Sequence, residues 1–158
     1  MHHFLDILML GASETGRLLL WLAIAFVGAS LRRMPGKAVC QVCLAMLLAF
    51  VINDLTLKPI VHAPRPFQRD GQVRVVGPRP QDYSFPSGHA AASFAAAVAL
   101  SRAWPAGTAV WFALAALVAY TRIYLGVHYP IDVVAGALAG IACGWFAVGR
   151  TRWRRPTS

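Results

Sequence analysis

Five apolar runs dominate this chain and restrict it to a membrane fold. They cover residues 18–31, 38–57, 90–100, 106–120 and 131–149. The chain is 58% hydrophobic and only 13% charged, whereas a soluble domain carries about 25% charged residues. A transmembrane helix needs about 20 residues, a length that the longer runs approach. We therefore predict an all-α, polytopic bundle of about five spans, forming one integral membrane domain over residues 1–158.

The N-terminal segment could add a sixth span. Residues 1–12 include Asp6 and lack the basic start of a signal peptide. They are typical of an amphipathic helix at the interface, or of an extension of the short first run. Further along, Gly136, Gly140 and Gly144 form a small-residue stripe that predicts a helix-packing face. The longest polar stretch, residues 58–85, contains five prolines and predicts a loop with a short helix inside it.

The net charge of +9 does not indicate nucleic acid, because the cations cluster between apolar runs and at the C-terminus. Anionic lipid and the positive-inside rule explain that placement. With five spans, one side of the membrane carries cations and no acid, and the other carries all six acids. We expect the first side to be cytoplasmic. Its cations are Arg32, Arg33, Lys37, Arg102, Arg150, Arg152, Arg154 and Arg155.

Polar motifs stand at the outward ends of the apolar runs. His128 and Asp132 lie four apart around Pro130, which suits the first turn of a helix. A hydrogen bond from the His128 ring to Asp132 would fix one tautomer and leave the other ring nitrogen as a nucleophile or base. Taken alone, the pair is better explained by an aspartate that caps the helix and a histidine at the interface.

A second motif is Pro86-Ser87-Gly88-His89, which opens the third run. Ser87 is a good N-cap, Gly88 allows close backbone approach, and the free N–H groups of the helix would bind an anion. An ordinary capped helix explains it equally well.

Three cations accompany these motifs, namely Lys58, Arg65 and Arg122. Individually they could reach lipid head groups along their apolar stems. Together they could surround the oxygens of a phosphoryl group.

In combination, Lys58-x6-Arg65-Pro66, Pro86-Ser87-Gly88-His89 and Arg122-x5-His128-x3-Asp132 resemble the type 2 phosphatidic acid phosphatase (PAP2) superfamily, which includes the vanadium haloperoxidases. The resemblance covers residues 58–132 and implies a PAP2/haloperoxidase-like helical core. Thr121 stands where the family usually has serine, and it keeps the hydroxyl.

The resemblance also implies roles. His128 would attack phosphorus, Asp132 would hold His128, and His89 would protonate the leaving oxygen. The substrate phosphate would be bound by Lys58, Arg65, Ser87, Gly88 and Arg122. No metal and no cofactor are implied.

The expected activity is a metal-independent lipid phosphatase of a bacterial inner membrane, with its site facing the periplasm or exterior. Undecaprenyl diphosphate or a phospholipid monoester is the first substrate candidate. Phosphatidylglycerophosphate and the lipid A 1-phosphate remain open, as does a phosphotransferase that passes the phosphoryl group to a lipid acceptor. A non-enzymatic lipid-binding protein is disfavoured because every proposed catalytic position is present. The expected partners are the substrate and membrane lipids, without nucleic acid.

Overall fold

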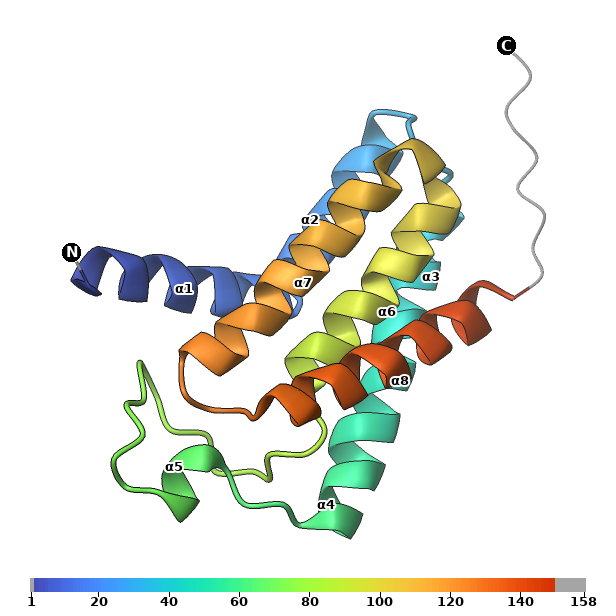
Figure 1. The fold of residues 1–158 in the computed structure, drawn as a ribbon. Coiled ribbons are helices and arrows are strands. Elements are labelled where there is room, and N and C mark those ends of the chain that lie inside the picture. The colour runs from blue at the N-terminus through green and yellow to red at the C-terminus, as the bar shows by residue number, and fades with distance from the viewer. Residues whose placement is uncertain (1, 150–158) are drawn as a thin grey trace.

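The computed structural model describes residues 2–149 and folds them into helices, with no strand in that range (Figure 1). The all-α prediction is therefore confirmed. Four of the arginines that we expect on the cytoplasmic side, Arg150, Arg152, Arg154 and Arg155, lie outside the described residues. The long elements are α1 (His2–Arg17), α2 (Leu19–Ser30), α3 (Lys37–Phe50), α6 (Gly88–Ala103), α7 (Thr108–Tyr124) and α8 (Pro130–Val148). The short ones are the π-helical η1 (Val51–Leu57), α4 (Lys58–Val61), α5 (Pro66–Arg69) and the 3₁₀ turn η2 (Pro105–Gly107).

Helix α6 is the centre of the bundle and contacts α3, α7 and α8. Its small side chains let the neighbours approach closely, and the glycine stripe of α8 packs against it. A Cβ at Gly136 would stand 2.4 Å from the carbonyl oxygen of Ser87, and one at Gly140 would stand 2.2 Å from that of Ala91. Backbone contact of this kind excludes any side chain at these glycines, so the predicted packing face is confirmed.

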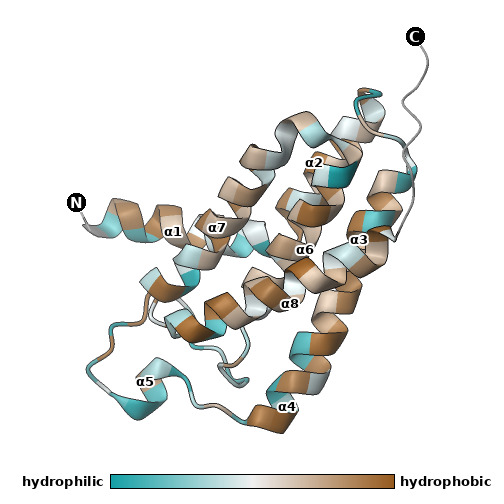
Figure 2. Ribbon diagram, turned by 45° about the vertical axis from the view of Figure 1, so that its right-hand side comes forward, coloured by the Kyte–Doolittle hydropathy of each residue, from teal (hydrophilic) through white to brown (hydrophobic). Residues whose placement is uncertain are grey.

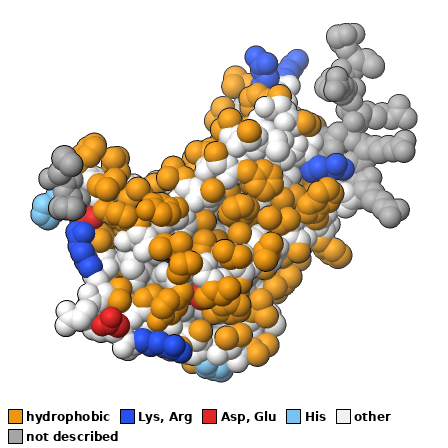
Figure 3. Space-filling model, viewed as in Figure 1, with side chains coloured by type: hydrophobic (Ala, Val, Ile, Leu, Met, Phe, Trp, Pro, Cys, Tyr) orange, Lys and Arg blue, Asp and Glu red, His pale blue; other side chains and the backbone are white. Residues whose placement is uncertain are grey.

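Hydrophobic side chains cover much of the face that Figure 3 shows, and the hydropathy colours of Figure 2 place hydrophobic residues along the long helices. Within residues 2–149, three helical stretches are long and apolar enough to cross a membrane, namely Lys37–Arg69, Pro105–Tyr124 and Pro130–Val148. Helices α1 and α2 together would form a fourth span, bent by 61°. Helix α6 has 16 residues, fewer than the roughly 20 that a bilayer needs. The count of five spans therefore stays a prediction.

The corner between α1 and α2 is fixed to the central helix. The indole of Trp21, which is completely buried, donates to the Gly16 carbonyl over 2.8 Å. The hydroxyl of Ser93 on α6 donates to the same carbonyl over 3.3 Å. The N-terminal segment is thus helical as predicted, but the helix runs to Arg17 instead of residue 12. This corner holds the end of α1 beside the start of α6.

The boundary predicted at residue 57 is wrong by four residues. The helix continues through α4 to Val61, and His62 then ends it with a φ of 51°. The π-helical turns of η1 explain the continuation, because the ring of Pro59 would clash with the carbonyl four residues earlier in a regular helix. Lys58 consequently lies on a helix instead of in the loop. The predicted short helix within the loop is α5.

Candidate active site

A polar cavity of about 220 Å³ lies at the end of the bundle where α1, the loop 62–86 and the α7–α8 turn meet (Figure 1). Its lining includes four of the predicted site residues, Lys58, Arg65, His89 and Arg122. They arrive on α4, the start of α5, the first turn of α6 and the last turn of α7. Segments separated by more than 60 residues thus meet in one cavity.

Arg65 connects the cavity's parts. Its Nη1 donates to the carbonyl of Val127 over 2.7 Å and lies 3.3 Å from Nε2 of His128. Its Nε donates to the backbone carbonyl of Asp82 over 2.8 Å. Only 2% of Arg65 is exposed. The guanidinium therefore has a fixed orientation and faces the imidazole directly.

Asp82 joins two of the predicted phosphate-binding cations. One carboxylate oxygen accepts a hydrogen bond from Arg65 Nη2 over 2.7 Å, and the other is paired with Lys58 Nζ. Lys58 also pairs with Asp54 over 2.8 Å, one turn earlier on the same helical stretch. Both Lys58 and Arg65 are therefore paired with carboxylates in the structure.

The charge of Asp82 is stabilised by these partners. Partial burial would raise the pKa of Asp82, but the hydrogen bonds and charges of Lys58 and Arg65 outweigh burial and lower the pKa to about 2. The carboxylate is thus ionised at any ordinary pH. Sequence reasoning missed Asp82 because it stands in a proline-rich loop, with no fixed spacing to either cation.

His128 and Asp132 adopt nearly the predicted arrangement. The His128 Nδ1 lies 3.5 Å from Asp132 Oδ2, a long separation at which Nδ1 has no regular hydrogen bond. The same oxygen accepts from the Ser84 hydroxyl over 2.5 Å and from the Tyr129 backbone N–H over 2.9 Å. Ser84, which sequence reasoning also missed, therefore orients the carboxylate toward the imidazole.

The tautomer of His128 follows from its neighbours. Arginine can only donate, so the Nε2 that faces Arg65 must carry a lone pair, and the ring proton must be on Nδ1, toward Asp132. Burial lowers the pKa of His128 to about 4, and the charges of Arg65 and Arg122 act in the same direction. The ring is thus neutral at physiological pH, and its Nε2 lone pair faces the Arg65 guanidinium.

The start of α6 behaves partly as predicted. The Ser87 hydroxyl caps the helix by accepting from the Ala90 N–H at 3.5 Å, and the Ser87 N–H donates to the Asp132 carbonyl over 2.9 Å. His89 lines the cavity, and its buried Nε2 has no hydrogen-bond partner within the described chain. Gly88 instead faces Asp54, whose carboxylate oxygens lie 2.6 and 2.7 Å from where a Cβ would stand.

Arg122 is held from the opposite side of the cavity. Its Nη1 donates to the hydroxyl of Ser13 on α1, and only 5% of Arg122 is exposed. The carbonyl of Arg122 accepts from the backbone N–H of His128 over 3.3 Å. This bond closes the turn after α7, which carries both residues. Among residues 2–149 no group of three or more His, Cys, Asp or Glu side chains is arranged to hold a metal ion.

The sequence has known relatives. A sequence model of the PAP2 superfamily matches residues 38–156. An undecaprenyl-diphosphatase of Sulfolobus acidocaldarius is 33% identical over 134 residues, which are 84% of this chain and 64% of that protein. A lipid A 4'-phosphatase of Bacteroides thetaiotaomicron is 35% identical over 116 residues, 68% of this chain and 51% of that protein. The chain thus spans between about half and two thirds of these relatives.

Two solved structures share the fold. The crystal structure of Aquifex aeolicus LpxE matches 94% of this chain and 87% of its own chain, with a TM-score of 0.79 and 32% identity. A transmembrane PAP2-type phosphatidylglycerolphosphate phosphatase from Bacillus subtilis matches 96% of this chain and 80% of its own, with a TM-score of 0.73 and 23% identity. With its apolar helices, the chain is an integral membrane protein. Because the family match covers most of the chain and includes all three motifs, this protein belongs to the PAP2 superfamily.

Proposed function

We propose that this protein is a lipid phosphate phosphatase that works through a phosphohistidine at His128. The observation that carries the proposal is the 3.3 Å approach of Arg65 Nη1 to His128 Nε2. Through this contact the neutral, oriented imidazole adjoins Arg65, which lines the cavity together with Lys58, Arg122 and His89. Phosphoryl transfer demands this combination of positioning and positive charge.

The proposed cycle has two steps. Phosphoryl oxygens first displace the Asp82 carboxylate from Lys58 and Arg65, and His128 Nε2 attacks phosphorus. The bond from phosphorus to the leaving oxygen breaks, and His89 gives that oxygen a proton. Water then attacks the phosphohistidine, transfers a proton to His89 and releases phosphate. Asp132 stabilises the His128 ring while it carries positive charge.

The proposal includes independence from metal, because Lys58, Arg65 and Arg122 supply the charge that a metal would supply. We also propose that Ser87 and Gly88 form part of the site that binds the substrate phosphate. Ser87 is supported by its position as the cap of α6. Gly88 has no such support, because its α-carbon faces the Asp54 carboxylate.

The substrate is a phosphate or diphosphate on a lipid anchor, with undecaprenyl diphosphate or a phospholipid monoester first. The names of the relatives, an undecaprenyl-diphosphatase and a lipid A 4'-phosphatase, support this class. A phosphotransferase would use the same phosphohistidine. Release of phosphate that depends on an added lipid acceptor would identify it.

The site faces the periplasm or exterior of a bacterial inner membrane. The turns between α2 and α3 and between α6 and α7 lie at the end of the bundle opposite the loop 62–86 (Figure 1). These turns and the helix ends beside them carry Arg32, Arg33, Lys37 and Arg102, as the positive-inside rule expects of a cytoplasmic face. A reporter fused after Ser158 should behave as cytoplasmic. A periplasmic signal would contradict this orientation.

The function is tested by phosphate release from a panel of lipid phosphates, with purified protein and EDTA present. We expect turnover by the wild type and the loss of several orders of magnitude in His128→Ala. The matched control is His3→Ala, which removes an exposed histidine at the start of α1. An absolute Mg²⁺ requirement, or normal turnover by His128→Ala, would refute the proposal.

A further inference from the structure

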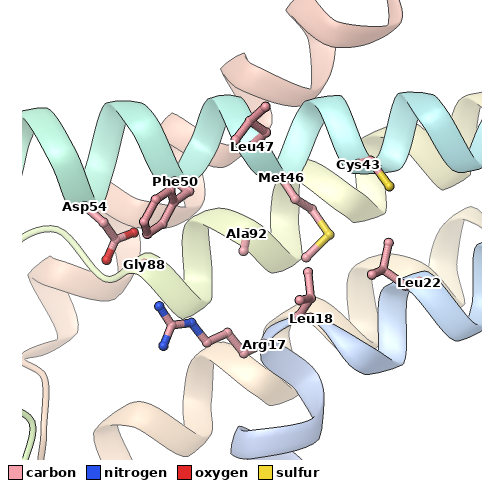
Figure 4. A pocket seen from close by; sticks show the side chains of 10 residues that line it. All are labelled: Arg17, Leu18, Leu22, Cys43, Met46, Leu47, Phe50, Asp54, Gly88 and Ala92. Carbon is pink, nitrogen blue, oxygen red and sulfur yellow. The ribbon is translucent and has the colours of Figure 1, made fainter.

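An apolar groove of about 540 Å³ lies between α2, α3 and α6 (Figure 4). Its walls are formed by Leu18, Leu22, Met46, Leu47 and Phe50. Leu18 and Leu47 are about half exposed on the outer surface, so the groove opens sideways toward lipid. At one end the lining becomes polar.

The polar end consists of Arg17, Asp54 and Gly88. Figure 4 shows the Arg17 guanidinium extending toward Gly88 and away from the apolar walls. Arg17 also lines the polar cavity that contains Lys58, Arg65 and His89. Arg17 therefore stands at the junction of the groove and the cavity.

Arg17 has no hydrogen-bond or ion-pair partner within residues 2–149, which sets it apart from the cations inside the cavity. Glu14, one turn earlier, lines the same cavity but forms no ion pair with Arg17. Asp54 is engaged by Lys58. An exposed, unpaired guanidinium at this junction is complementary to an anionic group located between the reacting phosphate and the lipid chain.

We propose that Arg17 binds the lipid-proximal phosphate of a lipid diphosphate, while the terminal phosphate lies in the cavity and the hydrocarbon chain continues into the groove. This inference rests on the proposed function and narrows its substrate class. A monophosphate places one phosphoryl group on Lys58, Arg65 and Arg122 and leaves Arg17 without an anion. A diphosphate supplies the second anion at the place where Arg17 stands.

The chemistry gives Arg17 a role specific to diphosphates. His128 Nε2 forms the bond to the terminal phosphorus, and the bond from that phosphorus to the bridging oxygen breaks. The electron pair of that bond goes to the bridging oxygen, so negative charge develops on the leaving lipid monophosphate before His89 protonates it. Water then releases the terminal phosphate from His128. A cation beside the leaving phosphate stabilises that charge as it develops.

The test compares a polyprenyl diphosphate with the monophosphate of the same chain, using the purified full chain and EDTA. Arg17→Gln should lower kcat/KM on the diphosphate by about 10- to 100-fold, the usual range for one charge-assisted contact. It should change the monophosphate rate by less than about threefold, and Arg17→Lys should restore part of the loss. Arg33→Gln, the same change at the other end of α2, should alter neither rate.

Inhibition by inorganic pyrophosphate and by inorganic phosphate gives a second measurement that needs no monophosphate turnover. Arg17→Gln should weaken pyrophosphate inhibition and leave phosphate inhibition unchanged. Equal losses on both lipids, or an unchanged pyrophosphate inhibition constant, would overturn the role of Arg17 while leaving the phosphatase itself intact. A wild type inactive on both lipids would instead refute the proposed function, and the inference with it.

Discussion

Replacing Asp82 with asparagine removes the carboxylate that joins Lys58 to Arg65 while nearly preserving the size of the side chain. In the structure this carboxylate contacts Arg65 Nη2 over 2.7 Å and also pairs with Lys58. A bound phosphoryl group must displace it. Asp82→Asn should therefore tighten the binding of phosphate analogues such as vanadate, which mimics the pentacoordinate phosphorus.

The magnitude follows from the two contacts and their exposure. A hydrogen bond to a charged group contributes about 1.5–3 kcal/mol when it is well protected. The Asp82 side chain is 51% exposed, so solvent screens both pairs, and the asparagine oxygen still accepts from one cation. Vanadate binding should therefore become more favourable by about 1–2 kcal/mol, which lowers its inhibition constant by about 5- to 30-fold.

The assay is vanadate inhibition of phosphate release in the presence of EDTA. It can be run at any pH above about 4, because the pKa of Asp82 is lowered to about 2 and the wild-type carboxylate stays ionised there. Asp70→Asn, which changes an exposed aspartate in the same loop, is the matched control. Unchanged or weaker vanadate inhibition in Asp82→Asn would show that the carboxylate orients the cations instead of competing for them.

Three further outcomes are expected. His89→Ala should lose more activity on a lipid monophosphate than on p-nitrophenyl phosphate, whose good leaving group needs less protonation; equal losses would remove the general-acid role. Because burial lowers the pKa of His128 to about 4, its ring should be neutral above that pH, and an NMR titration midpoint near 6.5 would contradict this. Gly140→Ala should lower the free energy of unfolding by about 1–3 kcal/mol through overpacking, and hence the thermal unfolding temperature, since its Cβ would stand 2.2 Å from the Ala91 carbonyl. Gly11→Ala, with nothing within 4 Å, should not.

The sequence predicted the parts of the site that local spacing determines. His128 and Asp132 are four apart around a helix start, so their side chains had to lie close to each other. Ser87 precedes a run of helix-forming alanines and therefore caps a helix. The glycine stripe of α8 was visible as a period of four. In each case the information lies within one helical turn or one helix, where the geometry is fixed.

The sequence did not predict the partners that reach the site from other segments. Asp82 and Ser84 lie in a loop without periodic structure, and only the tertiary fold brings them to Arg65 and Asp132. Ser13 meets Arg122 across 109 residues. The π-helical turns before Lys58 were also missed, because hydrophobic periodicity does not distinguish them from regular helix. These pairings depend on the packing of α1, α6 and α7.

Chemical trapping of the intermediate tests the central claim most directly. Wild-type protein mixed with a ³²P-labelled lipid phosphate and quenched within milliseconds should carry an acid-labile, base-stable label on the peptide that contains His128. His128→Ala should carry no label. Label on another residue, or turnover without any labelled protein, would contradict the proposed phosphohistidine mechanism.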